Sequence, residues 1–207
     1  MDGNQAEHRR DAIDSPEWQN RVFKYRGALL ALPALALAAF GRPSAGSIAL
    51  GLPIALAGEA VRCWAVGYSG VTTRSDAVIA PALVTAGPYA YTRNPLYVGN
   101  FLTALGFSIA FTGKLSRGGR TMLTALGLGT MAAVYATIIP LEEAYLRRRF
   151  GAAFEDYVER VPSIVPQLQA AEPQQGRYDP KVILKAETST FLTFGAMLVA
   201  LALKTKK

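Results

Sequence analysis

Two short polar segments contain the side chains whose types and spacing could support chemistry. The first reads Gly87-Pro88-Tyr89 and then Arg93-Asn94-Pro95-Leu96-Tyr97. A Gly-Pro pair predicts a turn, and Asn before Pro is typical of a helix start with proline in its first turn. The free amides of that turn, with Arg93 and Asn94 beside them, would suit a carboxylate or a nucleotide ribose. The alternative is a plain loop that enters a membrane helix, with tyrosines at the interface.

The second segment contains the neighbouring carboxylates Glu142 and Glu143, which come just after Pro140 at the end of an apolar stretch. We expect Pro140 to end that stretch. A carboxylate at the edge of a bilayer is costly unless it meets a cation, so Glu142 is a candidate to bind a cationic group of a ligand. Glu143 and Arg147 are spaced i, i+4 and are expected to pair with each other. The apolar side chains that follow predict one face of an amphipathic helix: Phe154, Tyr157, Val158 and Val161.

A third pair of charged residues, Glu59 and Arg62, lies inside an apolar stretch at i, i+3. Two interpretations stay open for it. The residues either form a neutralised pair that holds helices together, or they take part in binding the substrate.

The composition predicts that these residues are positioned by membrane helices. Hydrophobic residues make up 51% of the 207-residue chain and charged residues only 18%, below the share usual in a soluble domain. The 19 glycines suit close contact between helices in lipid. One cysteine, Cys63, and one histidine, His8, argue against a disulfide, a metal site or histidine catalysis. We assign the net charge of +7 to lipid headgroups rather than to nucleic acid.

Hydropathy predicts an all-α, polytopic membrane protein with about five transmembrane helices. The expected spans are 28–40, 45–68, 96–111, 122–140 and 183–203. Residues 1–20 form a polar tail without the features of a signal peptide, and residues 1–207 are expected to form one domain.

The basic residues predict the orientation of these spans. Of the 22 Lys and Arg residues, a cytoplasmic N-terminus places fourteen on the cytoplasmic side and seven on the other, with Arg62 inside a span. The positive-inside rule therefore favours a cytoplasmic N-terminus in an inner or equivalent membrane. It also places both long polar connections, 69–94 and 141–182, on the cytoplasmic side, where together they can form one site.

The two segments together resemble the isoprenylcysteine carboxyl methyltransferase and phospholipid methyltransferase family of integral-membrane methyltransferases. The resemblance covers residues 58–166. Its motifs are Gly87-Pro88-Tyr89, Arg93-Asn94-Pro95, Tyr97, Gly99, Glu142-Glu143, Phe150-Gly151, Tyr157 and Val161-Pro162.

The resemblance implies S-adenosylmethionine as cofactor and Arg93, Asn94 and Glu142 as the catalytic residues. It implies that the cofactor is bound by Pro81, Ala82, Leu83, Val84, Tyr89, Asn94, Pro95, Leu96, Tyr97 and Glu142. Two positions depart from the family. Asn94 replaces the usual histidine and cannot carry a proton. Ile138 stands where isoprenylcysteine methyltransferases have an arginine associated with the substrate carboxylate, which leaves Arg62, Arg74 and Arg93 as possible replacements. The predicted substrate-binding residues are Glu59, Arg62 and Arg74.

The leading hypothesis is S-adenosylmethionine-dependent methyl transfer to a lipophilic acceptor at the membrane interface. The acceptor is an isoprenylcysteine-type carboxylate, a lipid or another hydrophobic small molecule. Two alternatives stay open: an NADPH-dependent membrane reductase of the sterol reductase type, and a non-catalytic scaffold protein. The helix at 183–203 lies beyond the resembling region, where it either closes a lateral entrance or forms a dimer contact. The oligomeric state is open.

Overall fold

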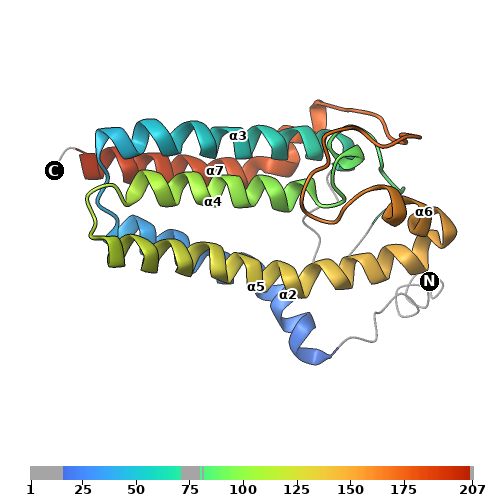
Figure 1. The fold of residues 1–207 in the computed structure, drawn as a ribbon, viewed down its shortest axis with the longest axis horizontal. Coiled ribbons are helices and arrows are strands. Elements are labelled where there is room, and N and C mark those ends of the chain that lie inside the picture. Colours follow the sequence, from blue (N-terminus) through green and yellow to red (C-terminus); the bar gives the residue numbers. More distant parts are fainter. Residues whose placement is uncertain (1–15, 71–79, 81, 206–207) are drawn as a thin grey trace.

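Short polar breaks between apolar stretches set the helix boundaries of this chain. The computed structural model describes residues 16–70, 80 and 82–205, and within them the regular structure is entirely helical (Figure 1). In chain order the elements are α2 (Glu17–Phe40), α3 (Ala45–Ser69), the 3-10 turn η2 (Gly87–Ala90), α4 (Pro95–Phe111), α5 (Arg117–Phe150), α6 (Ala152–Arg160) and α7 (Lys181–Thr205).

The helices form an elongated bundle. In Figure 1, α3, α4 and α7 lie side by side, and α5 runs along them with α2 behind it. The tightest neighbours are α3 and α4, followed by α2 and α5. The described parts of the long connections, residues 80, 82–94 and 161–180, lie together with α6 at one end of the bundle (Figure 1), so the two connections share one side, as the sequence predicted.

Glycines allow α3 and α4 to pack closely. A Cβ atom added to Gly51 would lie 2.3 Å from the carbonyl oxygen of Gly106, and one added to Gly106 would lie 2.3 Å from the amide nitrogen of Ala55. One added to Gly58 would lie 2.6 Å from the carbonyl oxygen of Gly99. Because backbone cannot give way at such distances, these positions require glycine. The expected role of glycine in helix contact is confirmed.

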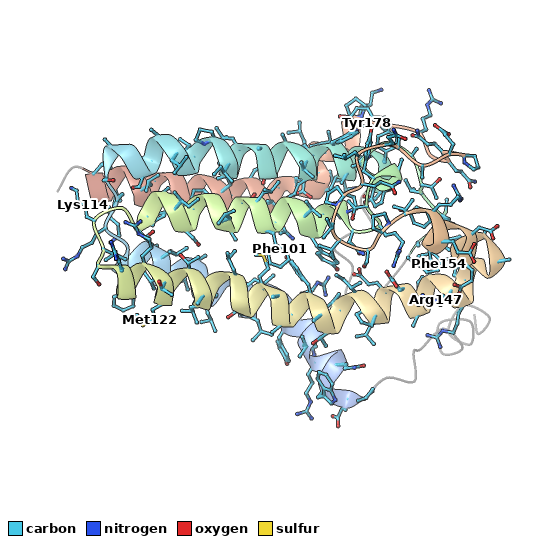
Figure 2. All side chains as sticks on the ribbon, viewed as in Figure 1. Phe101, Lys114, Met122, Arg147, Phe154 and Tyr178 are labelled. Atoms are coloured by element: carbon cyan, nitrogen blue, oxygen red, sulfur yellow. The ribbon has the colours of Figure 1, made fainter. Side chains whose placement is uncertain are left out.

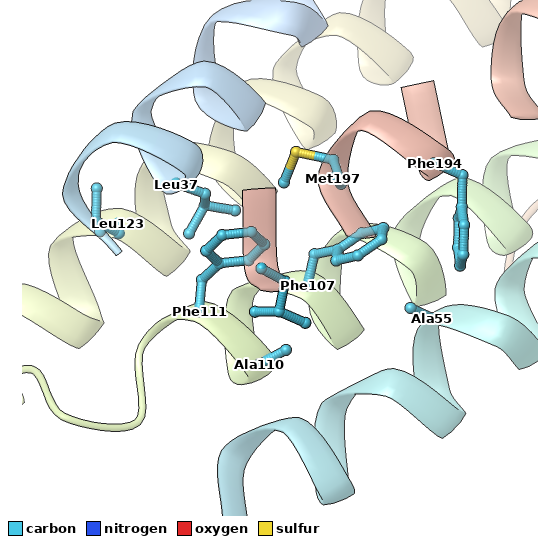
Figure 3. Close-up of a cluster of buried hydrophobic side chains, with 9 residues drawn as sticks. Leu37, Ala55, Phe107, Ala110, Phe111, Leu123, Phe194 and Met197 are labelled. Atoms are coloured by element: carbon cyan, nitrogen blue, oxygen red, sulfur yellow. The ribbon is translucent and has the colours of Figure 1, made fainter. Parts of the chain in front are cut away.

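The end of the bundle far from the long connections is closed by short, capped turns. Ser44 and Ser47 form a capping box at the start of α3, and the Ser47 hydroxyl also donates to the carbonyl of Ala110. Near this end, buried apolar side chains from α2, α3, α4, α5 and α7 form one cluster, which includes Leu37, Ala55, Phe107, Leu123 and Met197 (Figure 3). This packing holds five helices together where the loops are shortest.

The prediction of a polytopic all-α membrane protein is confirmed. Among the described residues, four helices are long and apolar enough to cross a membrane by length and composition: α2, α3, α5 and α7. The fifth predicted span is the shorter apolar helix α4. Large apolar side chains are exposed on the outer surfaces of the spans, among them Leu35, Leu126 and Val199, as expected for residues that face lipid.

One predicted helix boundary is wrong. Pro140 does not end its helix: α5 continues through it to Phe150, so Glu142 and Glu143 belong to the same helix as the membrane span. Burial of Ile138 and Leu141 on either side offsets the backbone hydrogen bond that the proline removes. Helix α2 begins at Glu17, within the last residues of the predicted polar tail 1–20. The amphipathic helix is confirmed as α6, with Phe154 and Tyr157 buried.

Candidate functional site

The end of the bundle that carries the long connections encloses a cavity of about 830 Å³. This volume lies in the range of pockets that bind cofactors and other small molecules. Figure 2 shows Arg147 and Phe154 at this end of the molecule and Lys114 and Met122 at the opposite end. The wall of the cavity is formed by residues from α2, α3, α4, α5, α6 and α7 and from the connection between α3 and α4.

Both polar segments that the sequence singled out line this one cavity. The predicted cofactor residues found in its wall are Ala82, Leu83, Val84, Tyr89, Asn94, Pro95, Leu96, Tyr97 and Glu142. Arg93 lines it as well. Pro81 lies outside the described residues. The structure therefore brings the two segments together.

Glu142 is held at the wall of the cavity by a residue of the first segment. The Tyr97 hydroxyl, on α4, donates a 2.8 Å hydrogen bond to Oε1 of Glu142, on α5. The Tyr97 ring stacks on Tyr135 with 4.2 Å between ring centroids, which fixes its direction. Arg26 of α2 interacts electrostatically with the same carboxylate. The site thus presents the Glu142 carboxylate beside aromatic walls.

Arg93 joins the loop to α5 and α6. Its Nη2 and Nε donate to Oε1 of Glu143 at 2.7 and 3.0 Å, and both side chains are nearly enclosed, at 11% and 13% exposure. Its Nη1 donates to the carbonyl of Val161 at the C-terminal end of α6, where a cation is favoured by the helix dipole. The expected Glu143–Arg147 pair is the weaker one, at 3.7 Å, since Arg147 lies closer to Glu155, at 3.1 Å.

Asn94 faces the segment that follows α6. Its Nδ2 donates to the carbonyl and the hydroxyl of Ser163, at 3.0 and 3.2 Å. We call residues 161–179 the strap, because they run along the loop between α3 and α4 and hydrogen-bond to its backbone. The amide of Ala171 donates to the carbonyl of Ala90 at 2.9 Å, and that of Thr85 to Gln175 at 2.8 Å. The strap thereby holds the loop in place, a role that the sequence did not indicate.

Two tyrosines connect the loop with α6. The Tyr157 hydroxyl donates to the carbonyl of Tyr89 at 2.7 Å. Burial raises the pKa of Tyr89 to about 12, with a smaller opposing effect from a hydrogen bond with Ser69. Burial also raises the pKa of Tyr157 far above its ordinary value. Both side chains are therefore neutral phenols, which act as hydrogen-bond donors and as walls rather than as bases.

Tight turns place the Tyr89 loop. Gly87 adopts a φ of +63°, which favours glycine, and a Cβ atom there would lie 2.2 Å from the Tyr68 ring. Helix α4 begins at Pro95 with Asn94 as its N-cap residue, as predicted. The predicted Gly-Pro turn is the 3-10 turn η2.

The three predicted substrate-binding residues differ in where the structure places them. Arg62 lines the cavity, but Glu59 is a buried residue of α3 outside its wall. Arg74 lies outside the described residues. Nη2 of Arg62 donates to both carboxylate oxygens of Glu187 on α7, at 2.8 and 2.7 Å, a contact that the sequence did not indicate. The Glu187 side chain is fully buried.

Further residues of the cavity were not found from the sequence. Nη1 of Arg62 donates to Oδ1 of Asn100, whose amide donates to the hydroxyl of Tyr135 at 2.6 Å. Figure 2 shows Phe101, the next residue on α4, between α4 and α5. Among the cavity residues that no motif marked are Phe23 and Arg26 of α2, Asn100, Tyr135, and Ser189, Thr190 and Thr193 of α7. Glu187, the partner of Arg62, had a signal in the sequence, because an acidic residue in an apolar stretch needs a cation.

The fold and the site define an integral membrane protein with a cavity at one end of its helix bundle, lined by apolar and polar side chains. The family profile described as phospholipid methyltransferase matches residues 47–153, from α3 to the start of α6. The chain therefore belongs to the phospholipid methyltransferase family. No solved structure matches it significantly.

The curated relatives are similar over part of their length. The chain is 42% identical over 84 residues to a protein-S-isoprenylcysteine O-methyltransferase of Schizosaccharomyces pombe, covering 41% of this chain and 33% of that protein. It is 38% identical to the nickel-cobalt-cadmium resistance protein NccN of Alcaligenes xylosoxydans xylosoxydans, covering 42% of this chain and 37% of the relative. It is 29% identical to a probable protein-S-isoprenylcysteine O-methyltransferase of Oryza sativa, covering 56% of this chain and 60% of the relative. The match thus spans between a third and three fifths of these relatives.

Proposed function

We propose that this protein transfers a methyl group from S-adenosylmethionine to a lipophilic acceptor at the membrane interface. The observation that carries the proposal is the convergence of the Arg93–Tyr97 segment and Glu142 on one cavity. Membership of the phospholipid methyltransferase family and the similarity to isoprenylcysteine methyltransferases support the same reaction class.

The residues of the cavity fit S-adenosylmethionine. Its cationic groups need a carboxylate, and Glu142 supplies one that a neutral donor, Tyr97, already orients. Its adenosine part needs apolar walls, which Leu83, Leu146 and Phe154 provide. The backbone of Leu83 and Val84 and the segment from Asn94 to Tyr97 would hold the rest of the molecule, together with Tyr89.

S-adenosylmethionine supplies an electrophilic methyl group, and its transfer leaves the electron pair of the broken C–S bond on sulfur while a lone pair of the acceptor forms the new bond. The protein needs no nucleophile of its own for such a displacement. Its residues have to hold the two reactants in line and keep water away from them. Tyr97 keeps Glu142 at the wall, while Arg93 and Asn94 fix the loop to α5 and to the strap.

We further propose that the cavity faces the cytoplasm. The end that contains it carries Arg147–Arg149 and Arg160, and the positive-inside rule favours this end for the cytoplasm. The cofactor reaches the cavity from the aqueous side, and a lipophilic acceptor reaches it from the bilayer.

Calorimetry of the purified protein tests this proposal. We expect S-adenosylmethionine to bind and NADPH not to bind. The Glu142→Ala variant should lose most of the S-adenosylmethionine affinity, whereas Glu159→Ala, which removes an exposed carboxylate of α6, should keep it. Binding of NADPH alone would support a reductase and overturn the proposal, and binding of neither compound would support a scaffold. Equal affinity of wild type and Glu142→Ala would remove Glu142 from the site.

A further inference from the structure

Side chains of α3, α4 and α7 line a further part of the cavity. We call it the α7 end and define it by five side chains that line the cavity: Arg62, Asn100, Ser189, Thr190 and Thr193. Three of them come from α7, which lies outside residues 47–153, where the family profile matches. The α7 end is therefore a feature of this chain that the family match does not describe.

The charge of the α7 end is cancelled within the protein. Nη2 of Arg62 donates to both carboxylate oxygens of Glu187 and, at 3.2 Å, to Thr190, while Nη1 donates to Asn100. The Arg62 side chain is 10% exposed and that of Glu187 is fully buried. The two Nη nitrogens are thus engaged inside the protein. A carboxylate that entered here would also meet the negative charge of Glu187.

The groups that line the α7 end are neutral hydrogen-bonding groups apart from this pair. They are the hydroxyls of Ser189, Thr190 and Thr193 and the amide of Asn100, with the phenol of Tyr135 beside it. Such groups can donate to and accept from a ligand hydroxyl. None of these groups carries a charge with which a charged ligand could form an ion pair.

The cavity wall includes residues of both α2 and α7. The two helices are joined near the closed end of the bundle, where Leu37 belongs to the same cluster as Met197 and Leu201 and the Lys204 ammonium donates to the carbonyl of Ala39 at 2.9 Å. At the level of the cavity the wall takes Phe23 from α2 and Ser189 from α7, and Ser189 is exposed. We place the exit for a hydrocarbon tail between these two helices.

We propose that the α7 end is the subsite for the methyl acceptor and that it selects an amphiphile with a neutral hydroxyl head, an alcohol or a phenol, over one with a carboxylate. Glu187 sets this preference by neutralising Arg62. The inference rests on the proposed function in naming the ligand as the acceptor. Methylation of such a head forms an O–CH₃ bond, breaks the S–CH₃ bond with its electron pair left on sulfur, and releases the hydroxyl proton to water.

Direct binding of matched amphiphiles tests the proposal. The probes are 4-dodecylphenol, dodecanoate and dodecylamine, titrated at neutral pH into the purified full-length protein in nanodiscs. We expect the phenol to bind wild type at least about tenfold more tightly than dodecanoate or dodecylamine. Dodecanoate binding as tightly as the phenol, for instance through Arg26 on α2, would overturn the proposal, and so would a preference for the amine.

Glu187→Gln supplies a gain of affinity that misfolding cannot produce. It leaves the Arg62 charge uncompensated, so dodecanoate should gain about tenfold or more in affinity while the phenol changes little. The double variant Arg62→Gln/Glu187→Gln removes both charges and should restore the wild-type ranking of the three amphiphiles. It keeps the proposal testable if the single variant does not fold. The matched control is Thr188→Val, at an exposed α7 position next to Glu187, which should change neither affinity.

An unchanged ranking in Glu187→Gln would overturn the role of Glu187, as would a double variant that prefers dodecanoate. Titration with S-adenosylmethionine separates this inference from the proposed function, because amphiphile binding needs no catalysis. A protein that shows the ranking and the Glu187→Gln gain but does not bind S-adenosylmethionine refutes the proposed function and keeps the subsite. A protein that binds S-adenosylmethionine without the ranking refutes the subsite alone.

Discussion

Tyr97 of α4 donates a 2.8 Å hydrogen bond to Glu142 of α5, so each of the two polar segments of the sequence contributes one member of a single contact. The two residues lie in different helices, and the bond crosses the wall of the cavity that both line. The Tyr97 hydroxyl is a neutral donor, so it orients the Glu142 carboxylate without neutralising its charge. This is the arrangement that a cationic ligand requires.

Replacement of Tyr97 by Phe should weaken cofactor binding while the fold is kept. The change removes one hydroxyl and leaves the ring stacked on Tyr135. Because hydrogen bonds to charged groups contribute about 1.5–3 kcal/mol, we expect the dissociation constant of S-adenosylmethionine to rise roughly 10- to 100-fold in calorimetry. Tyr145→Phe, which removes a hydroxyl from the same stretch of α5 outside the cavity wall, serves as the control. An unchanged dissociation constant in Tyr97→Phe would show that the hydroxyl does not orient the cofactor carboxylate.

Loss of Arg93 should reduce the stability of the whole end of the bundle that contains the cavity. Its pair with Glu143 is nearly enclosed, and removal of one partner of such a pair typically costs about 3–5 kcal/mol. Arg93→Ala should therefore lower the midpoint of thermal unfolding in detergent by many degrees. Arg147→Ala is the control, because it breaks a pair with Glu155 in which the two side chains are 41% and 54% exposed. Loss of such an exposed pair should lower the free energy of unfolding by only about 0–1 kcal/mol. Equal midpoints in the two variants would show that Arg93 does not hold the loop.

The packing of α3 on α4 should be sensitive to a single methyl group. A Cβ atom on Gly106 would lie 2.3 Å from the backbone of α3, so Gly106→Ala forces the helices apart, at a typical overpacking cost of about 1–3 kcal/mol. Gly129→Ala of α5 is the matched control, because a Cβ atom there meets nothing within 4 Å and alanine favours a helix. Denaturant unfolding should give a lower midpoint for Gly106→Ala and an equal or higher one for Gly129→Ala. A Gly106→Ala protein as stable as wild type would contradict the close contact.

Most of the fold could be predicted because its signals are local. Apolar stretches of about the length of a bilayer gave the spans, and the Gly87-Pro88 and Asn94-Pro95 pairs gave the turn and the helix start. The predicted boundary at Pro140 was wrong. It rested on the hydrogen bond that a proline removes from a helix, whereas burial of Ile138 and Leu141 stabilises α5 beyond this residue.

The ion pairs could not be predicted because they depend on how the helices pack. The i, i+4 rule assigned Glu143 to Arg147, but the loop brings Arg93 closer. The spacing i, i+3 indicated Glu59 as a possible partner of Arg62. The carboxylate that Arg62 contacts in the structure belongs to Glu187, which lies 125 residues further along the chain. The sequence shows that both charges lie in apolar stretches and need partners. Only the packing of α7 against α3 shows which partner each one has.

Cysteine labelling tests the orientation of the cavity in the membrane. In a Cys63→Ala background, which removes the only native thiol, Leu168→Cys places a cysteine on the strap at a position that is 99% exposed. Lys114→Cys places one at the opposite end of the bundle (Figure 2). If the cavity faces the cytoplasm, a membrane-impermeant maleimide should label Lys114→Cys in intact cells and Leu168→Cys only in inverted vesicles. The reverse pattern would place the cavity on the outer side, away from the cytoplasmic S-adenosylmethionine that the proposed reaction consumes.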